Sequence, residues 1–114
     1  MEFKSTVTEG ILTLSLNGNL IGEDVGASLL EAATNAIDKG VLLCAIDIEK
    51  VKYINSSGIG VLITLLTKFR NQDGEVVIVN PSEHVQKLLI ITKLTAIFKV
   101  ADSIEQAISE LKTV

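Results

Sequence analysis

Residues 41–48 form a short, almost continuous apolar run, and this run restricts the fold more than any other feature of the chain. Only Asp47 interrupts it. Such a run is typical of a strand that is covered on both faces, as in a parallel sheet. Residues 76–79 form a second run of this kind, which Asn80 and Pro81 end. Because parallel strands must be joined by crossover connections, usually helices, we expect an α/β fold.

The segments around these runs carry apolar residues at helical spacing, which predicts a helix in each of them. Gly40 is a stop signal for the first helix, Ser82 can cap the third, and Asp102 with Glu105 resembles a capping box for the last. The predicted inward faces are Val25, Leu29, Ala32, Ala33 and Ala36; Ile59, Leu62, Ile63, Leu66 and Phe69; Val85, Leu88, Leu89 and Thr92; and Ile104, Ala107, Ile108 and Leu111.

The remaining strands complete the pattern. Residues 3–7 and 11–16 alternate apolar and polar side chains around Glu9 and Gly10, which predicts a hairpin, and residues 96–100 are expected to form a last short strand. The order is therefore β-β-α-β-α-β-α-β-α, with residues 1–114 as a single domain. We expect a mixed, mostly parallel sheet of about five strands packed with about four helices. The pattern does not fix the strand order.

Composition excludes several classes of function. The net charge is −4 without a basic stripe, so nucleic acid is not expected as a partner. Cys44 is the only cysteine, which excludes an internal disulfide, and its apolar neighbours indicate a buried, inert thiol. The N-terminus lacks a signal-peptide pattern, and the apolar stretch 59–66 is too short to span a membrane. A cytoplasmic location is expected.

Residues 47–60 are the segment where function is expected. They leave the buried strand and deliver Ser56 and Ser57 to the start of an apolar helix, with Asn55 before them and Gly58 after them. Asn and Ser are common helix caps, and glycine permits close packing, so a purely structural role explains this pattern. A helix start also exposes unpaired N–H groups, which would hold a phosphate attached to a serine. The two roles are compatible.

Enzyme motifs are not found in this segment. It lacks the Lys-Ser/Thr ending of a phosphate-binding loop, and Asn55 stands where a nucleophile elbow requires glycine. His84, the single histidine, is interpreted as a solvated helix residue, and Asp47 as a structural carboxylate that binds loop amides. We expect no catalytic residue, no metal and no cofactor. A small hydrolase or transferase with Ser57 as nucleophile is a weakly supported alternative.

Residues 45–48, Val51 and residues 54–62, which read INSSGIGVL, resemble the signature of STAS domains, specifically of bacterial anti-sigma factor antagonists. The resemblance covers the whole chain and implies a STAS fold. It implies a binding protein that, when unphosphorylated, engages an anti-sigma factor with serine kinase activity and releases the sigma factor. Phosphorylation of Ser57 would reverse this binding, and a serine phosphatase would remove the phosphate. Asn55, Ser56, Gly58, Ile59 and Gly60 would shape the partner-binding site.

Two positions depart from the family pattern. Asn55 replaces the usual Asp, and Ile21 stands where family members often carry Asp near the serine. These departures leave a second hypothesis open, a STAS scaffold that assembles signalling proteins without being phosphorylated. Ile90 is expected to point away from the inward face of its helix, where it would be available to a partner.

Overall fold

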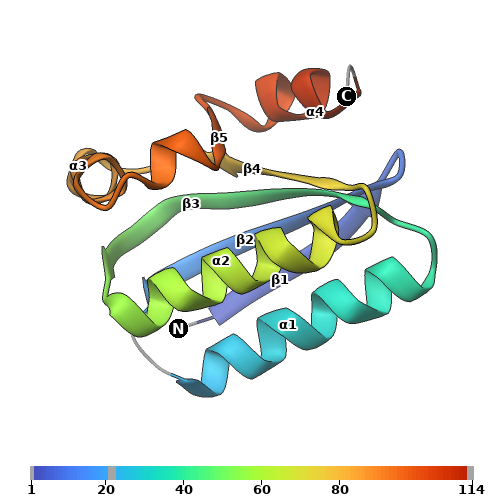
Figure 1. Ribbon diagram of the computed structural model, residues 1–114, viewed down its shortest axis with the longest axis horizontal. Coiled ribbons are helices and arrows are strands. Elements are labelled where there is room, and N and C mark those ends of the chain that lie inside the picture. The colour runs from blue at the N-terminus through green and yellow to red at the C-terminus, as the bar shows by residue number, and fades with distance from the viewer. Residues whose placement is uncertain (1, 21–22, 113–114) are drawn as a thin grey trace.

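A computed structural model describes the backbone of residues 2–20 and 23–112, and the side chains of residues 2–20 and 26–112 (Figure 1). Strands and helices alternate after an initial pair of strands, as the sequence predicts. The elements are β1 (Glu2–Thr8), β2 (Ile11–Leu20), α1 (Glu23–Asp38), β3 (Leu43–Ile54), α2 (Ser56–Arg70), β4 (Glu75–Val79), α3 (Glu83–Ile91), a 3₁₀ turn (Leu94–Ala96), β5 (Lys99–Ala101) and α4 (Ile104–Lys112).

The five strands form one mixed sheet, and the α/β expectation is confirmed. Their order is β1-β2-β3-β4-β5, with β1 antiparallel to β2 and the other neighbours parallel. The β1–β2 hairpin turns at Glu9 and Gly10, which both have positive φ angles. The carboxyl ends of β2, β3, β4 and β5 therefore meet at one edge of the sheet, where ligand and partner sites of such folds gather.

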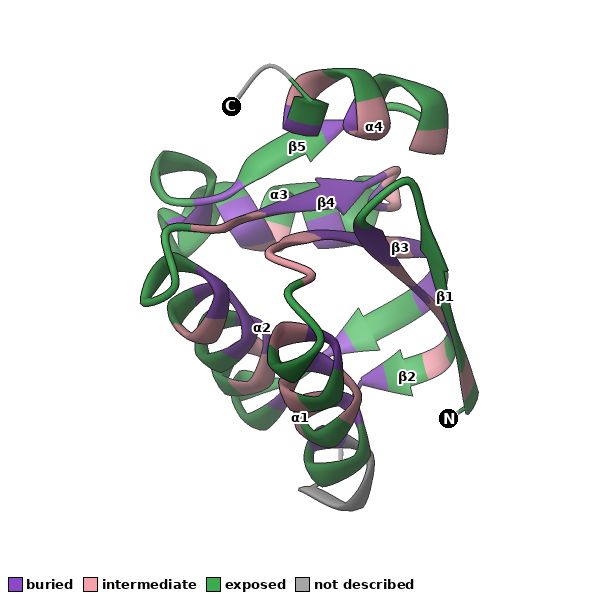
Figure 2. Ribbon diagram, turned by 90° about the vertical axis from the view of Figure 1, so that its right-hand side faces the viewer, coloured by how far each residue is buried: buried purple, intermediate pink, exposed green. Residues whose placement is uncertain are grey.

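Helices cover both faces of the sheet. α1 and α2 lie on one face, and their buried residues point toward it (Figure 2). The larger of two hydrophobic cores lies on this face, and it contains Leu29 of α1, Leu62 of α2 and Leu89 of α3. On the opposite face, Ala107 and Leu111 of α4 close a smaller core over the middle of the sheet. No helix within the described parts of the chain is long and apolar enough to cross a membrane.

The third strand is longer than the sequence predicts. We expected it to end at Ile48 and a loop to follow, but β3 continues to Ile54. Twice in this extension β3 advances by three residues while β2 advances by two, so that Ile48, Val51 and Ile54 are all buried. Each shift inserts one extra residue, as a β-bulge does. The strand was missed because its apolar residues recur every third position instead of every second.

The chain after α3 also differs from the prediction. Leu94–Ala96 is a 3₁₀ turn, and the last strand is Lys99–Ala101, so the expected strand at 96–100 was placed too early. The predicted box of Asp102 and Glu105 is wrong by one residue. The Ser103 Oγ accepts a hydrogen bond from the Gln106 N–H at 3.1 Å, and the Asp102 N–H donates to the Gln106 Oε1 at 2.8 Å. Ser103 therefore caps α4 as the first residue of a capping box does, but the Gln106 side chain binds the N–H of Asp102, the residue before the cap, and not that of Ser103.

Two side chains that were predicted to face inward are exposed instead. Ile63 of α2 is 37% exposed, and Leu65 is buried on that helix instead. Thr92 follows the end of α3, where it is exposed and donates a hydrogen bond through its hydroxyl to the Leu88 carbonyl at 2.7 Å. The Val25 side chain lies outside those described.

Candidate functional site

The segment of interest, Asn55 to Gly58, joins the carboxyl end of β3 to the first turn of α2. It lies at one end of the molecule, the end where β3 descends to α2 in Figure 1. The predicted site residues are brought together here by their sequence adjacency. Ser56 and Ser57 are both exposed, Gly58 is buried, and Ile59 is half-buried against the larger core.

Asn55 is the N-cap of α2. Its backbone is extended, with φ −99° and ψ −176°, and its Oδ1 accepts a hydrogen bond from the Gly58 N–H at 2.9 Å. The Asn55 carbonyl accepts the first intrahelical bond from the Ile59 N–H at 2.9 Å. The asparagine thus satisfies an N–H group that the helix start leaves unpaired. An aspartate at this position would make the same bond and add a negative charge.

Leu20, at the end of β2, contacts this helix start through its backbone. Its carbonyl oxygen accepts a hydrogen bond from the Asn55 N–H at 3.3 Å, and the Cα of Gly58 packs against the same oxygen. A Cβ at Gly58 would overlap that oxygen and would lie 2.9 Å from the Ile54 Cγ2. Only glycine permits this approach. Gly60 has open space around its Cα, so the close-packing role predicted for both glycines holds for Gly58 alone.

Ser57 is therefore exposed to solvent in the first turn of α2. The Leu20 carbonyl contacts this helix start on both sides of Ser57, at Asn55 and at Gly58. A serine sealed in the core would have been inaccessible to any modifying enzyme, but Ser57 is exposed. Its helix is 15 residues long, and the first turn contains no acidic residue. Such a helix end favours a negative group by roughly 0.3–1 kcal/mol when exposed. Ile21 lies outside the described residues.

The other candidate residues have structural surroundings. Asp47 is half-buried within β3, and its Oδ1 accepts a hydrogen bond from the Glu49 N–H at 3.0 Å, so it binds an amide of its own strand and not of a loop. Cys44 is fully buried, as predicted, and burial raises the pKa of its thiol. No group of three or more His, Cys, Asp or Glu side chains in the described residues could hold a metal ion.

Tyr53 is a candidate that sequence analysis missed. Its ring is 59% exposed and makes an edge contact with the His84 ring, with 5.5 Å between the ring centroids. His84 is exposed, as expected, at the first turn of α3. Tyr53 was hidden because the segment that contains it was interpreted as a loop. The change of apolar spacing to Ile48, Val51 and Ile54 was the only signal in the sequence.

Comparison with known proteins identifies the family of this chain. The STAS domain family model matches residues 2–107. The chain belongs to the STAS domain family. The family was predicted from the motif at 54–62, and that prediction is confirmed.

Several relatives cover nearly the whole chain. BtrV of Bordetella bronchiseptica, whose name assigns it provisionally to the anti-sigma factor antagonists, is 32% identical over 106 residues, 92% of this chain and 90% of its own length. The crystal structure of TM1081 from Thermotoga maritima has a TM-score of 0.87 at 24% identity, covering 96% of this chain and 94% of TM1081.

The anti-sigma factor antagonist SpoIIAA shares the fold in two forms. The unphosphorylated form has a TM-score of 0.77 at 21% identity and covers 99% of this chain and 100% of its own. The phosphorylated form, from Bacillus, has a TM-score of 0.75 at 21% identity and covers 96% and 98%. These likenesses establish the STAS fold for this chain.

Proposed function

We propose that this chain is an anti-sigma factor antagonist whose partner binding is controlled by phosphorylation of Ser57. Unphosphorylated, it binds an anti-sigma factor with serine kinase activity in the cytoplasm and thereby releases a sigma factor. The observation that carries the proposal is the exposed Ser57 at the capped start of α2, at the carboxyl edge of the sheet. BtrV, which is 32% identical, is provisionally named an anti-sigma factor antagonist, and this supports the antagonist part of the proposal.

Phosphorylation would act locally. A phosphoserine carries about −1.5 to −2 charges at pH 7 and adds bulk. In the middle of a contact surface, that charge must be desolvated or repelled, and each loss of about 1.4 kcal/mol lowers affinity tenfold. The hydrogen bond from Gly58 to Asn55 and the contact of Gly58 with Leu20 do not involve the hydroxyl. The fold can therefore stay unchanged while the surface changes.

The partner surface extends beyond Ser57 in this proposal. Ile90 and Ile91 at the end of α3 are 62% and 77% exposed, and the outward orientation predicted for Ile90 is confirmed. Large apolar side chains that are this exposed on neighbouring positions favour a protein contact over simple hydration. The proposal predicts that Ile90→Ser weakens partner binding without unfolding the protein.

Incubation with the cognate kinase and ATP, followed by mass spectrometry, tests the assignment of Ser57. A phosphate is expected in the wild type and in Ser56→Ala, and it is expected to be absent in Ser57→Ala. Ser57→Ala should still bind the anti-sigma factor, whereas Ser57→Asp should bind it more weakly. A phosphate confined to another residue would refute the assignment. Treatment with the serine phosphatase should restore binding.

The second candidate function is a STAS scaffold that is not phosphorylated. The observation that favours it is Asn55, which caps α2 through its amide oxygen, so that an amide stands at position 55 in place of a carboxylate. Partners captured from cells separate the two functions. Partner affinity that phosphatase treatment does not change supports the scaffold, and affinity that rises after treatment supports the switch.

A further inference from the structure

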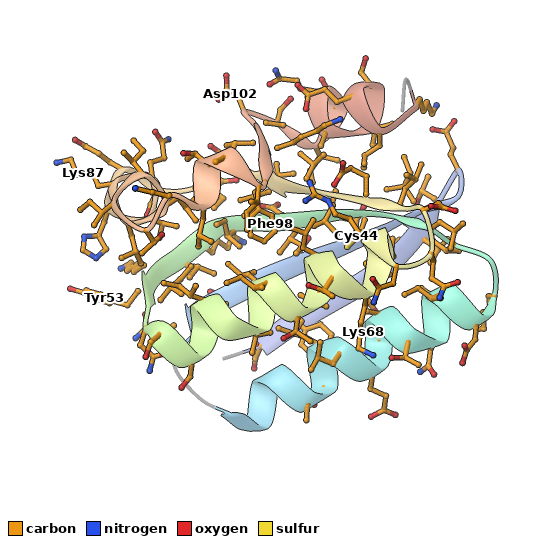
Figure 3. All side chains as sticks on the ribbon, viewed as in Figure 1. Cys44, Tyr53, Lys68, Lys87, Phe98 and Asp102 are labelled. Carbon is orange, nitrogen blue, oxygen red and sulfur yellow. The ribbon has the colours of Figure 1, made fainter. Side chains whose placement is uncertain are left out.

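A basic surface lies at the same end of the molecule as Ser57, on a chain that is acidic as a whole. Lys52, Tyr53, His84 and Lys87, together with Ser82 and Glu83, line a shallow hollow of about 590 Å³. We call the first four residues the basic end patch. They come from the end of β3 and the first turns of α3, and Figure 3 shows Tyr53 and Lys87 at the end of the molecule where β3 runs into α2.

The charges of the patch are available to a partner. Lys52 makes no ion pair with any described residue, and Lys87 makes only a 3.7 Å contact with Glu83, in which both side chains are well exposed. Exposed pairs of this kind have little net energy. One glutamate thus faces two lysines and a histidine, within a chain of net charge −4. The local charge is therefore opposite in sign to the net charge of the chain, and it attracts an anion.

The shape and composition of the patch fit a protein segment. Tyr53 is more than half exposed, and its ring is supported at the edge by the His84 ring. An exposed tyrosine is typical of protein interfaces, where Tyr is enriched. The hollow is wide and open, and the exposed Ile90 and Ile91 lie farther along α3. These features favour an extended contact over a small molecule.

We infer that the basic end patch is the docking site for an acidic segment of the anti-sigma partner, and that a phosphate on Ser57 weakens docking by cancelling the charge of the patch. This inference rests on the proposed function. Lys52 precedes Ser57 by five residues, so their Cα atoms lie within about 18 Å of each other. Charges at that distance interact at low ionic strength and are screened at high salt, because the Debye length falls from about 30 Å at 0.01 M to about 3 Å at 1 M.

Association kinetics with the purified anti-sigma factor, identified by co-purification, test the inference. We expect Lys52→Glu/Lys87→Glu to lower the association rate about tenfold at low ionic strength, with a smaller effect at high salt and little change in dissociation. The matched control is Lys39→Glu/Lys99→Glu, which makes the same change in net charge at exposed positions outside the patch. Its rate should stay within about twofold of the wild type. Equal losses in both double variants, or no loss in either, would overturn the inference.

A combined variant tests the charge cancellation and separates the two proposals. If the phosphate acts through the patch, Ser57→Asp should weaken binding less in the Lys52→Glu/Lys87→Glu protein than in the wild type. An undiminished effect of Ser57→Asp in that background would refute the cancellation. If Ser57→Asp binds like the wild type while the lysine variant binds slowly, the switch at Ser57 fails and the docking site stands. The urea midpoint of each variant confirms that it is folded.

Discussion

Replacement of Gly58 by alanine is the sharpest test of how the start of α2 is held. The added methyl group would overlap the Leu20 carbonyl oxygen and would lie 2.9 Å from the Ile54 Cγ2 and 3.0 Å from the Leu20 Cγ. The carbonyl belongs to the backbone of a buried strand end, which a rotamer change cannot move. The helix start must shift instead, which strains the hydrogen bond that Leu20 accepts from Asn55.

The magnitude follows from two opposing terms. Overpacking costs roughly 1–3 kcal/mol, and contact with a fixed backbone atom indicates the upper end of that range. Alanine gains up to about 1 kcal/mol over glycine in a helix. We therefore expect Gly58→Ala to lower the free energy of unfolding by about 2 kcal/mol. The matched control is Gly60→Ala, two residues later in α2, where the methyl group meets nothing within 4 Å. This variant should gain about 0.5–1 kcal/mol.

Urea unfolding followed by circular dichroism measures both changes. With a slope of about 1.5 kcal/mol per M, typical of a small domain, the midpoint should fall by about 1.3 M for Gly58→Ala and rise by about 0.5 M for Gly60→Ala. The reasoning would be refuted if Gly58→Ala were as stable as the wild type. It would also fail if both variants were more stable than the wild type, because helix propensity alone would then account for the data.

Three further predictions concern the caps and the buried thiol. Asn55→Ala should lower the free energy of unfolding by about 1 kcal/mol while Asn55→Asp retains the cap; equal midpoints in urea for the two variants would contradict this. Ser103→Ala should lower the free energy of unfolding by about 1 kcal/mol and Asp102→Ala by less than about 0.5 kcal/mol. A larger loss for Asp102→Ala would support the capping box predicted at Asp102. Cys44, whose buried thiol stays protonated because its pKa is raised, should react with Ellman's reagent only after unfolding; rapid reaction of the folded protein at pH 8 would contradict its burial.

The sequence predicted the architecture wherever side-chain spacing and burial agree. The runs at 41–48 and 76–79 fall in the strands β3 and β4, and each of the four helical patterns falls in a helix. The prediction failed where tertiary contacts decide the backbone. Apart from the three-residue spacing of Ile48, Val51 and Ile54, nothing local distinguishes residues 49–54 from a loop. Their strand conformation depends on pairing with β2 and on two register shifts. Capping at Ser103 in place of Asp102 differs by one residue, a shift that spacing alone does not resolve.

The candidate site was predicted in part for the same reason. Asn55, Ser57 and Gly58 stand together in the sequence, and their motif indicates a helix start directly. The role of Leu20 could not be predicted, because it acts through a backbone carbonyl that any residue would provide. The basic end patch joins Lys52 with Lys87, which are 35 positions apart, through the packing of α3 against β3. That proximity depends on the fold.

The register shifts of β3 link the start of α2, where Ser57 lies, to the proposed docking site. With strict alternation, Lys52 and Tyr53 would point to opposite faces of the sheet. The extra residue between Val51 and Ile54 leaves both side chains exposed while Ile54 stays buried as the anchor before Asn55. One irregularity therefore places a cation and an aromatic ring on the surface and fixes the start of α2 that carries Ser57. Deletion of Lys52 should restore alternation and disturb both features together, so that loss of partner binding and a lower urea midpoint appear in the same variant. A deletion that impaired binding but left stability unchanged would show that the shift serves the surface alone.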